Sequence, residues 1–220
     1  MKIVEPGYEI LSPVDGKAIL KHIELCGRVC YKSEDKISEG TAQKFVASII
    51  KSGHESVLEH FGISVLFTVD RGVTHELVRH RIASFSQEST RYCNYSKGKF
   101  GSEITVVDIA GGIANDQTMK GLDGEEISAI IEEWMTACED AEKHYFKMLA
   151  LGASPQIARS VLNNSTKADI VVTMNLREWR HFFSLRTAPA AHPQMREATI
   201  PLLRDFQGRI PGVFDDIEEA

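Results

Sequence analysis

Large apolar side chains occupy every second position from Phe61 to Val69, within the segment FGISVLFTVD. Because successive side chains of a strand point to opposite faces, this period of two predicts a strand with one buried face. A second run, DIVVTMN at residues 169–175, predicts another strand. Shorter strand-like pieces are expected between residues 83 and 107, with turns around Lys97–Gly98.

Spacings of three and four residues predict helices, and the longest covers residues 123–152. Glu125 and Glu126 suit its first turn, where the helix dipole favours carboxylates, and Gly152 ends it. Its apolar stripe consists of Ile127, Ile131, Trp134, Cys138, Ala141, Tyr145 and Met148, and we expect Trp134, Tyr145 and Met148 to be core. Further helices are predicted at residues 16–31, 41–52 with Thr41 as N-cap, 71–81, from Ser154–Pro155 onward, 176–186 and 193–206. Long helices and few strands, with no regular βαβ rhythm, indicate an α+β fold.

Composition narrows the class of protein. The chain has 220 residues, and we expect one domain over residues 1–220. No apolar run is long enough for a membrane span, and the first residues lack a secretion signal, so we expect a cytoplasmic protein. A net charge of −6 argues against a nucleic-acid-coating protein. Cys26, Cys30, Cys93 and Cys138 are expected to be free thiols, the first two buried on one helix face.

Arginines concentrate between Asp70 and Tyr92, where four of them face three acidic residues. If the helix ends near Arg79, the side chains of Arg79 and Arg81 can point the same way. If residues 87–91 are extended, Gln87, Ser89 and Arg91 share one face. An amide, a hydroxyl and a guanidinium suit a phosphate beside a hydrogen-bonding base or sugar. Spacing alone also fits a solvated arginine face with surface ion pairs.

The same segment resembles the signature of the flavin-dependent thymidylate synthases, which is R-H-R, two residues, Ser, four residues, Ser, one residue, Arg. Here Arg79, His80, Arg81, Ser84, Ser89 and Arg91 stand in that register. Other segments resemble the family too, so matching stretches span roughly residues 54–196. They are GHESVLEH at residues 53–60, IARSVL with Arg159, the run from Asn175 to Arg186, and AHPQMR at residues 191–196.

The resemblance implies the family fold, an antiparallel or mixed sheet flanked by long helices. It also implies conversion of dUMP to dTMP, with 5,10-methylenetetrahydrofolate as one-carbon donor, FAD as cofactor and NADPH as electron source. The family assembles as homotetramers with shared active sites; no metal, nucleic acid or membrane is implied. By position, FAD would contact Ser56, Arg79, His80, Arg81, Gln87, Asn175, Arg177, His181 and His192. By position, dUMP would contact Glu76, Arg79, Gln87, Glu88, Ser89, Thr90, Arg91, Arg159 and Arg186.

The resemblance gives Arg186 the catalytic place, at the uracil edge. Uracil C5 must become nucleophilic to accept a one-carbon unit, and a guanidinium beside the ring favours the electron-rich form deprotonated at N3. Arginine suits this role because it stays charged at any working pH. The flavin carries the hydride chemistry, so no protein nucleophile is required.

This chain departs from some members at Glu76, where they carry Gln, and at Gln87, where they carry Glu. The loop before His192 is also one residue longer than in some members. An FAD- and nucleotide-binding oxidoreductase with a different acceptor is therefore a second hypothesis, and a nucleic-acid-binding protein using the arginines is a third. Ser89 and Cys93 are poor candidates for a nucleophile because the sequence fixes no base beside them. His22 with Cys26 and Cys30 makes an incomplete metal set.

Overall fold

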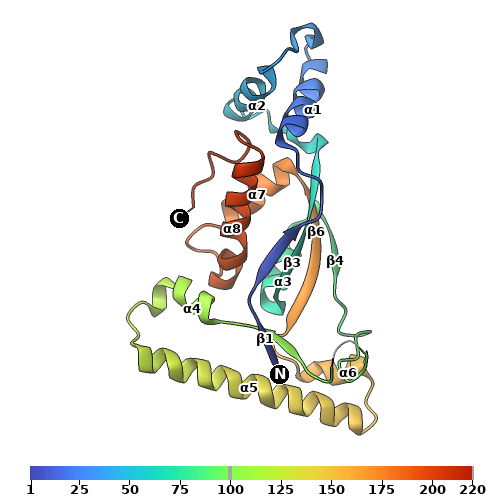
Figure 1. The fold of residues 1–220 in the computed structure, drawn as a ribbon, viewed down its shortest axis with the longest axis vertical. Helices are drawn as coiled ribbons and strands as arrows, with labels where there is room; N and C mark the ends of the chain where they lie inside the picture. The colour runs from blue at the N-terminus through green and yellow to red at the C-terminus, as the bar shows by residue number, and fades with distance from the viewer. Residues whose placement is uncertain (99–100, 220) are drawn as a thin grey trace.

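The computed structural model describes residues 1–98 and 101–219 and shows an α+β fold (Figure 1). Its main sheet has four strands in the order β2-β3-β6-β4, and all neighbours in it are antiparallel. The bounds are β2 (Gly7–Ile10), β3 (Gly62–Asp70), β4 (Ala83–Gln87) and β6 (Lys167–Asn175). A separate pair, β1 (Lys2–Val4) with β5 (Thr105–Val107), is parallel. The predicted fold class and both long strands are confirmed.

The long strands β3 and β6 pair along their whole length, from Gly62 opposite Asn175 to Asp70 opposite Lys167. The alternate apolar side chains of β3 from Ile63 to Val69 are all buried, as their period of two predicts. The helices α7 (Leu176–Arg186) and α8 (Pro193–Arg209) lie beside the sheet (Figure 1). Between these elements lies an aromatic cluster of Phe67, Trp179, Phe182, Phe183, Phe206 and Phe214.

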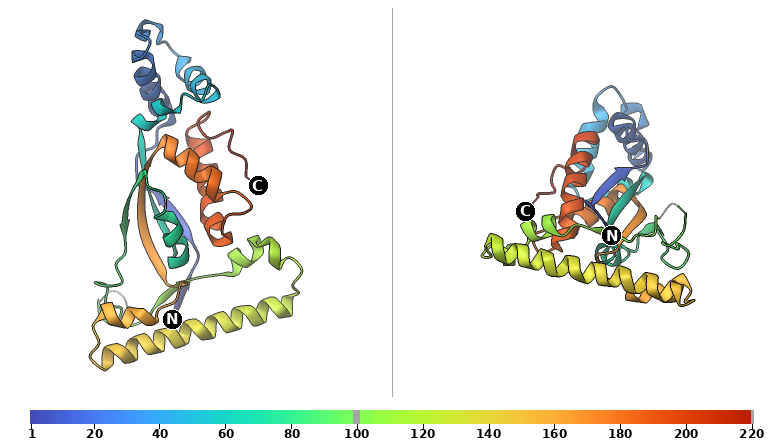
Figure 2. Two further views of the ribbon diagram at one scale, coloured as in Figure 1. Left: turned by 180° about the vertical axis from the view of Figure 1, so that it is seen from behind. Right: turned by 60° about the horizontal axis from the view of Figure 1, so that its bottom comes forward.

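The helix α3 (Arg71–Leu77) lies against the sheet, and the remaining helices lie at the two ends of the molecule (Figure 2). At one end stand α1 (Gly16–Val29) and α2 (Thr41–Lys51), followed by the 3₁₀ segment η2 (Glu55–His60). Across the other end runs α5 (Gly124–Ala150), between α4 (Ala110–Asn115) and α6 (Pro155–Ala158). A capping box between Asp123 and Glu126 starts α5. No helix in the described part of the chain combines the length and apolar character needed to cross a membrane.

Three local expectations need correction. The N-cap of α2 is Gly40, and Thr41 is the first helical residue, with its hydroxyl donating to Glu24. Of the three residues expected in the core on α5, Tyr145 is fully buried, whereas Trp134 and Met148 are half-buried at the edge of a small second core. Cys26 is half-buried and Cys30 is exposed, so, contrary to expectation, neither is fully buried; none of the four cysteines takes part in a disulfide.

Candidate functional site

The helix α3 (Arg71–Leu77) places the first signature residues. Asp70 caps it, since its Oδ1 accepts a 2.7 Å bond from the Val73 amide. The helix ends before Arg79, so Arg79 and Arg81 both project into solvent. His80 lies between them and turns inward, with 6% of its surface exposed. Arg79 and Arg81 both line one small cavity, described below, as expected if their side chains point the same way.

Arg186, the last residue of α7, is held by three hydrogen bonds. Its Nε donates to His80 Nε2 at 3.1 Å. Its Nη1 donates to the Glu76 carboxylate at 2.7 Å, and its Nη2 to the Glu76 carbonyl at 3.1 Å. A guanidinium has five N–H groups, so two remain for a ligand. The structure therefore brings Arg186 to Glu76 and His80, from which it is far apart in the sequence.

These contacts determine the protonation of His80. A guanidinium can only donate, so Nε2 must be the accepting nitrogen. The proton then sits on Nδ1 and is donated to Glu178 Oε1 at 3.1 Å. Burial lowers the pKa of His80, and the charge of Arg186 lowers it further, whereas Glu178 opposes the shift. His80 is therefore a neutral imidazole that orients Arg186.

His80, Glu178 and His181 lie close enough for a metal ion, with one ligand atom of each within 4.8 Å of the others. The hydrogen bonds argue against such an ion. Both ring nitrogens of His80 are already engaged, by Glu178 and by Arg186. A guanidinium beside the cluster would also repel a cation. We therefore interpret the three residues as part of an organic-ligand site.

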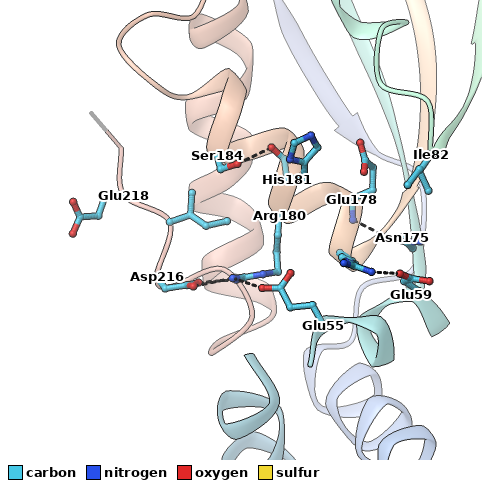
Figure 3. Close-up of a pocket in the computed structure, with 12 residues that line it drawn as sticks. Glu55, Glu59, Ile82, Asn175, Glu178, Arg180, His181, Ser184, Asp216 and Glu218 are labelled. Atoms are coloured by element: carbon cyan, nitrogen blue, oxygen red, sulfur yellow. Dashed lines mark hydrogen bonds and ion pairs between the residues drawn. The ribbon is translucent and has the colours of Figure 1, made fainter. Parts of the chain in front are cut away.

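A cavity of about 810 Å³ opens beside this cluster and is drawn in Figure 3. It brings together three of the residues expected at FAD, namely Asn175, Arg177 and His181. Asn175 also caps α7, accepting a 2.9 Å bond from the Glu178 amide. A smaller cavity of about 250 Å³ adjoins it, lined by Arg79, His80, Arg81, Ile82, Glu178, His181, Leu185 and Arg186. Because Ile82, Glu178 and His181 line both, the two form one continuous site.

Two arginines of the larger cavity behave differently. Arg177 pairs with Glu59 at 2.6 Å, but the two side chains are 53% and 45% exposed. Such a surface pair contributes at most about 1 kcal/mol, so Arg177 can turn to another anion. Arg180 is buried and donates to Asp216 at 2.6 and 2.8 Å, to Glu55 at 3.2 Å and to the Val213 carbonyl. It anchors the C-terminal segment, as Figure 3 shows.

Sequence reasoning missed both Arg180 and Glu178. Neither belongs to the family pattern, and both lie in a helix that periodicity describes only as amphipathic. The sequence does carry one signal for Arg180: it stands inside WRHFF, where the surrounding aromatic side chains are buried. A charged residue within a buried aromatic run requires a buried partner.

The second half of the signature differs from the expected extended strand. The strand β4 ends at Gln87, and residues 89–93 form a turn in which the Tyr92 and Cys93 amides donate to the Ser89 carbonyl. The Ser89 hydroxyl accepts a 3.3 Å bond from the Arg91 amide, a local bond that favours turns over strands. Arg91 is exposed, with its guanidinium 5.2 Å from the ring centre of Tyr92.

A third cavity, of about 360 Å³, lies beside this turn and is lined by Arg71, Thr90, Gln156, Arg159, Ser160 and Leu162. Arg159 donates to the Thr90 hydroxyl at 3.1 Å, so these two expected dUMP residues do meet. Arg71, which sequence reasoning counted only as charge, lines the same cavity. Two guanidiniums at one cavity make it suitable for an anion.

The other expected residues have definite partners or lie elsewhere. Gln87 donates to the Thr74 hydroxyl at 3.0 Å. Both carboxylate oxygens of Glu88 are engaged, by Tyr95 and by Lys167. Ser56, in η2, is exposed, and His192 is half-buried at the N-cap of α8. Neither lines the three cavities, so one chain does not bring Ser56 and His192 to them.

Known proteins resemble this chain over nearly its full length. The family model described as thymidylate synthase complementing protein matches residues 17–212. A flavin-dependent thymidylate synthase of Mycobacterium sp. (strain JLS) is 35% identical over 238 residues, covering 98% of this chain and 85% of that protein. One of Geobacter sulfurreducens is 33% identical, covering 90% and 85%. The crystal structure of the UMP/dUMP methylase PolB of Streptomyces cacaoi, bound with 5-Br dUMP, superposes with a TM-score of 0.77 at 25% identity, covering 98% of this chain and 96% of PolB.

Proposed function

The chain belongs to the flavin-dependent thymidylate synthase family, and on this premise we propose that it methylates dUMP to dTMP, using 5,10-methylenetetrahydrofolate, FAD and NADPH. The proposal rests on the hydrogen bonds by which Glu76 and His80 orient Arg186. Three contacts fix the guanidinium and leave two N–H groups free to meet the uracil edge. A fixed cation at this edge stabilises the pyrimidine deprotonated at N3 and makes C5 nucleophilic.

The length of helix α3 matches a nucleotide that spans from the anion cavity of Arg71 and Arg159 to Arg186. Arg71, its first residue, lines the anion cavity with Arg159, and Glu76 holds Arg186 near its other end. Five residues of α-helix rise about 7.5 Å. That separation is comparable to the distance between the phosphate and the base of a mononucleotide. In this proposal Arg71, Arg159, Ser89 and Arg91 bind the phosphate.

The continuous site formed by the cavities of about 810 Å³ and 250 Å³ fits a flavin. Three arginines there can donate to it: Arg79 and Arg81, which form no ion pair with the described residues, and Arg177, whose exposed pair with Glu59 can open. A cavity of about 810 Å³ is of the size that organic cofactors occupy. Asn175, Arg177 and His181 would hold the flavin in this cavity, with Arg79, His80 and Arg81 at its edge. Bound FAD would supply the hydride chemistry, with NADPH as electron source and methylenetetrahydrofolate as one-carbon donor.

We also propose a single functional domain over residues 1–220 and a homotetramer with shared sites. Two observations support sharing. Ser56 and His192 lie away from the cavities of their own chain, so contacts from these residues to FAD would come from a neighbouring copy. The N-terminal half of α5 also leaves Ile127, Ile130 and Ile131 only partly covered, which suits a subunit contact.

An anaerobic titration tests the function. The FAD-reconstituted protein is mixed with NADPH, with and without dUMP, and flavin absorbance is followed; methylenetetrahydrofolate is then added and dTMP is assayed. Bleaching followed by dTMP is the expected result. Bleaching without dTMP would favour the oxidoreductase with a different acceptor, which the exchange of carboxylate and amide at Glu76 and Gln87 motivates. A protein that binds no flavin would refute both.

A further inference from the structure

We propose that Lys167 and Tyr95 are positioning residues for phosphate binding, acting through Glu88 on the turn that carries Ser89 and Arg91. The inference rests on the proposed function. It goes beyond the family pattern, in which Glu88 would be a nucleotide contact. Neither Lys167 nor Tyr95 lines the anion cavity of Arg71 and Arg159.

Glu88 is fixed from two sides. Lys167, the first residue of β6, donates to its Oε2 at 2.8 Å. Tyr95 donates to its Oε1 at 3.1 Å. The Glu88 amide donates to the Asp169 carbonyl at 2.8 Å, which continues the pairing of β4 with β6 beyond the end of the strand. Because both carboxylate oxygens already accept hydrogen bonds from the protein, we assign Glu88 a positioning role.

The turn after Glu88 is held at a second point. Thr90 is buried and its hydroxyl accepts the 3.1 Å bond from Arg159. Between the fixed residues 88 and 90 stands Ser89, and Arg91 follows directly. The anchors therefore determine where the backbone that carries the Ser89 hydroxyl and the Arg91 guanidinium lies. A phosphate that binds in two places needs this spacing held before it arrives.

The positive charge of Lys167 lies beside two carboxylates, those of Glu88 and Asp169. Lys167 also donates to Asp169 at 2.7 Å, so a single ammonium compensates two carboxylates close to the turn. Burial opposes its charge, but the bonds to Asp169 and Glu88 prevail and hold the pKa of Lys167 above its ordinary value. Burial and the nearby Glu88 carboxylate raise the pKa of Tyr95, so its phenol remains a donor. Without Lys167, two uncompensated carboxylates would repel a phosphate dianion.

The test compares Lys167→Met with Lys167→Arg and Tyr95→Phe in the FAD-loaded enzyme. Lys143→Met is the matched control, because Lys143 is an exposed lysine on α5 with a loose 3.8 Å contact to Asp140. We measure KM for dUMP, kcat, and inhibition constants for inorganic phosphate and for deoxyuridine, which lacks the phosphate. Flavin affinity and Tm are measured in parallel.

In Lys167→Met, the KM for dUMP and the inhibition constant for phosphate are expected to rise at least tenfold. The inhibition constant for deoxyuridine, the flavin affinity and kcat at saturating dUMP should change less than threefold. Lys167→Arg should restore binding, and Tyr95→Phe should show a weaker effect of the same kind. Unchanged phosphate inhibition in both Lys167→Met and Tyr95→Phe would overturn the proposal, as would equal losses for phosphate and deoxyuridine. A wild-type enzyme that binds flavin but not dUMP would instead overturn the proposed function, and this inference with it.

Discussion

Replacing Arg186 with lysine preserves one positive charge and removes the planar guanidinium. In the structure that plane meets His80 Nε2 through Nε and Glu76 through both terminal nitrogens. A lysine ammonium is a single point on a flexible chain, so it can reach the Glu76 carboxylate but cannot also meet His80 and present two donors to a pyrimidine. The Arg186→Lys substitution therefore keeps the positive charge at this position but loses the fixed orientation of its donors.

The size of the effect follows from the donors lost. Removing one preorganised hydrogen-bond donor to a developing oxyanion raises the activation free energy of the reaction by about 3 kcal/mol. That corresponds to roughly a 100-fold slower reaction. FAD affinity should change little, because the larger cavity of Asn175 and Arg177 does not include Arg186 among its lining residues. Binding and chemistry are thus expected to separate in this variant.

A single-turnover experiment measures the separation. The reduced, FAD-loaded variant is mixed with dUMP and methylenetetrahydrofolate, and dTMP is quantified over time; FAD affinity is measured by fluorescence quenching. Arg209→Lys is the control, since Arg209 is an exposed arginine whose partner, Asp205, lies four residues away. A rate for Arg186→Lys within a factor of ten of wild type would refute the activating role of the guanidinium.

Three further outcomes are expected. Arg91→Ala should weaken dUMP binding by about 10- to 150-fold, the value of a charged hydrogen bond, and leave the free energy of unfolding within about 0.5 kcal/mol, as calorimetric titration and melting would show. Arg180→Met should lower the free energy of unfolding by about 2 kcal/mol and Tm by roughly 4–8 °C, because it removes charged hydrogen bonds to Asp216 and Glu55 and the donor to the Val213 carbonyl; an unchanged Tm contradicts this. Burial, and then the charges of nearby carboxylates, raise the pKa of Glu197 to about 7. The native state therefore holds a proton that the unfolded chain releases, and stability falls as pH rises from about 4.5 to about 7. Glu197→Gln should gain Tm relative to wild type across that window, and a gain independent of pH would argue against the assignment.

The sequence predicted those parts of the fold that depend on local patterns. The period of two in β3 and the period near 3.6 in α7 are properties of single elements, because the apolar or polar character of each residue indicates whether its side chain faces the core. The strand beyond Gln87 was wrong because Ser89 bonds to the backbone two residues on and closes a turn. The predicted N-cap of α2, Thr41, was wrong by one residue, because Gly40 with its positive φ of 80° precedes the helix and leaves Thr41 as the first helical residue.

The candidate site was predictable in its residue types but not in its contacts. The family pattern named Arg186, His80 and Glu76, yet their mutual bonds join residues 106 and 110 positions apart. No periodicity carries information over such a separation. The role of Glu178, which fixes the tautomer of His80, depends on which face of α7 meets His80, and this is a property of the tertiary structure.

The charges of the signature segment give the exchange at positions 76 and 87 a physical meaning. Glu76 carries the carboxylate and pairs with Arg186, while Gln87 is neutral and bonds to Thr74. Glu88, the next carboxylate, is compensated by Lys167. Each of these carboxylates therefore has a cation before a nucleotide enters, and none is left to repel a phosphate. Within the signature segment from Asp70 to Tyr92, the four arginines Arg71, Arg79, Arg81 and Arg91 form no ion pair with the described residues. These four cations lie where an anionic ligand would neutralise them, so a chain with a net charge of −6 can still offer a local site for an anion.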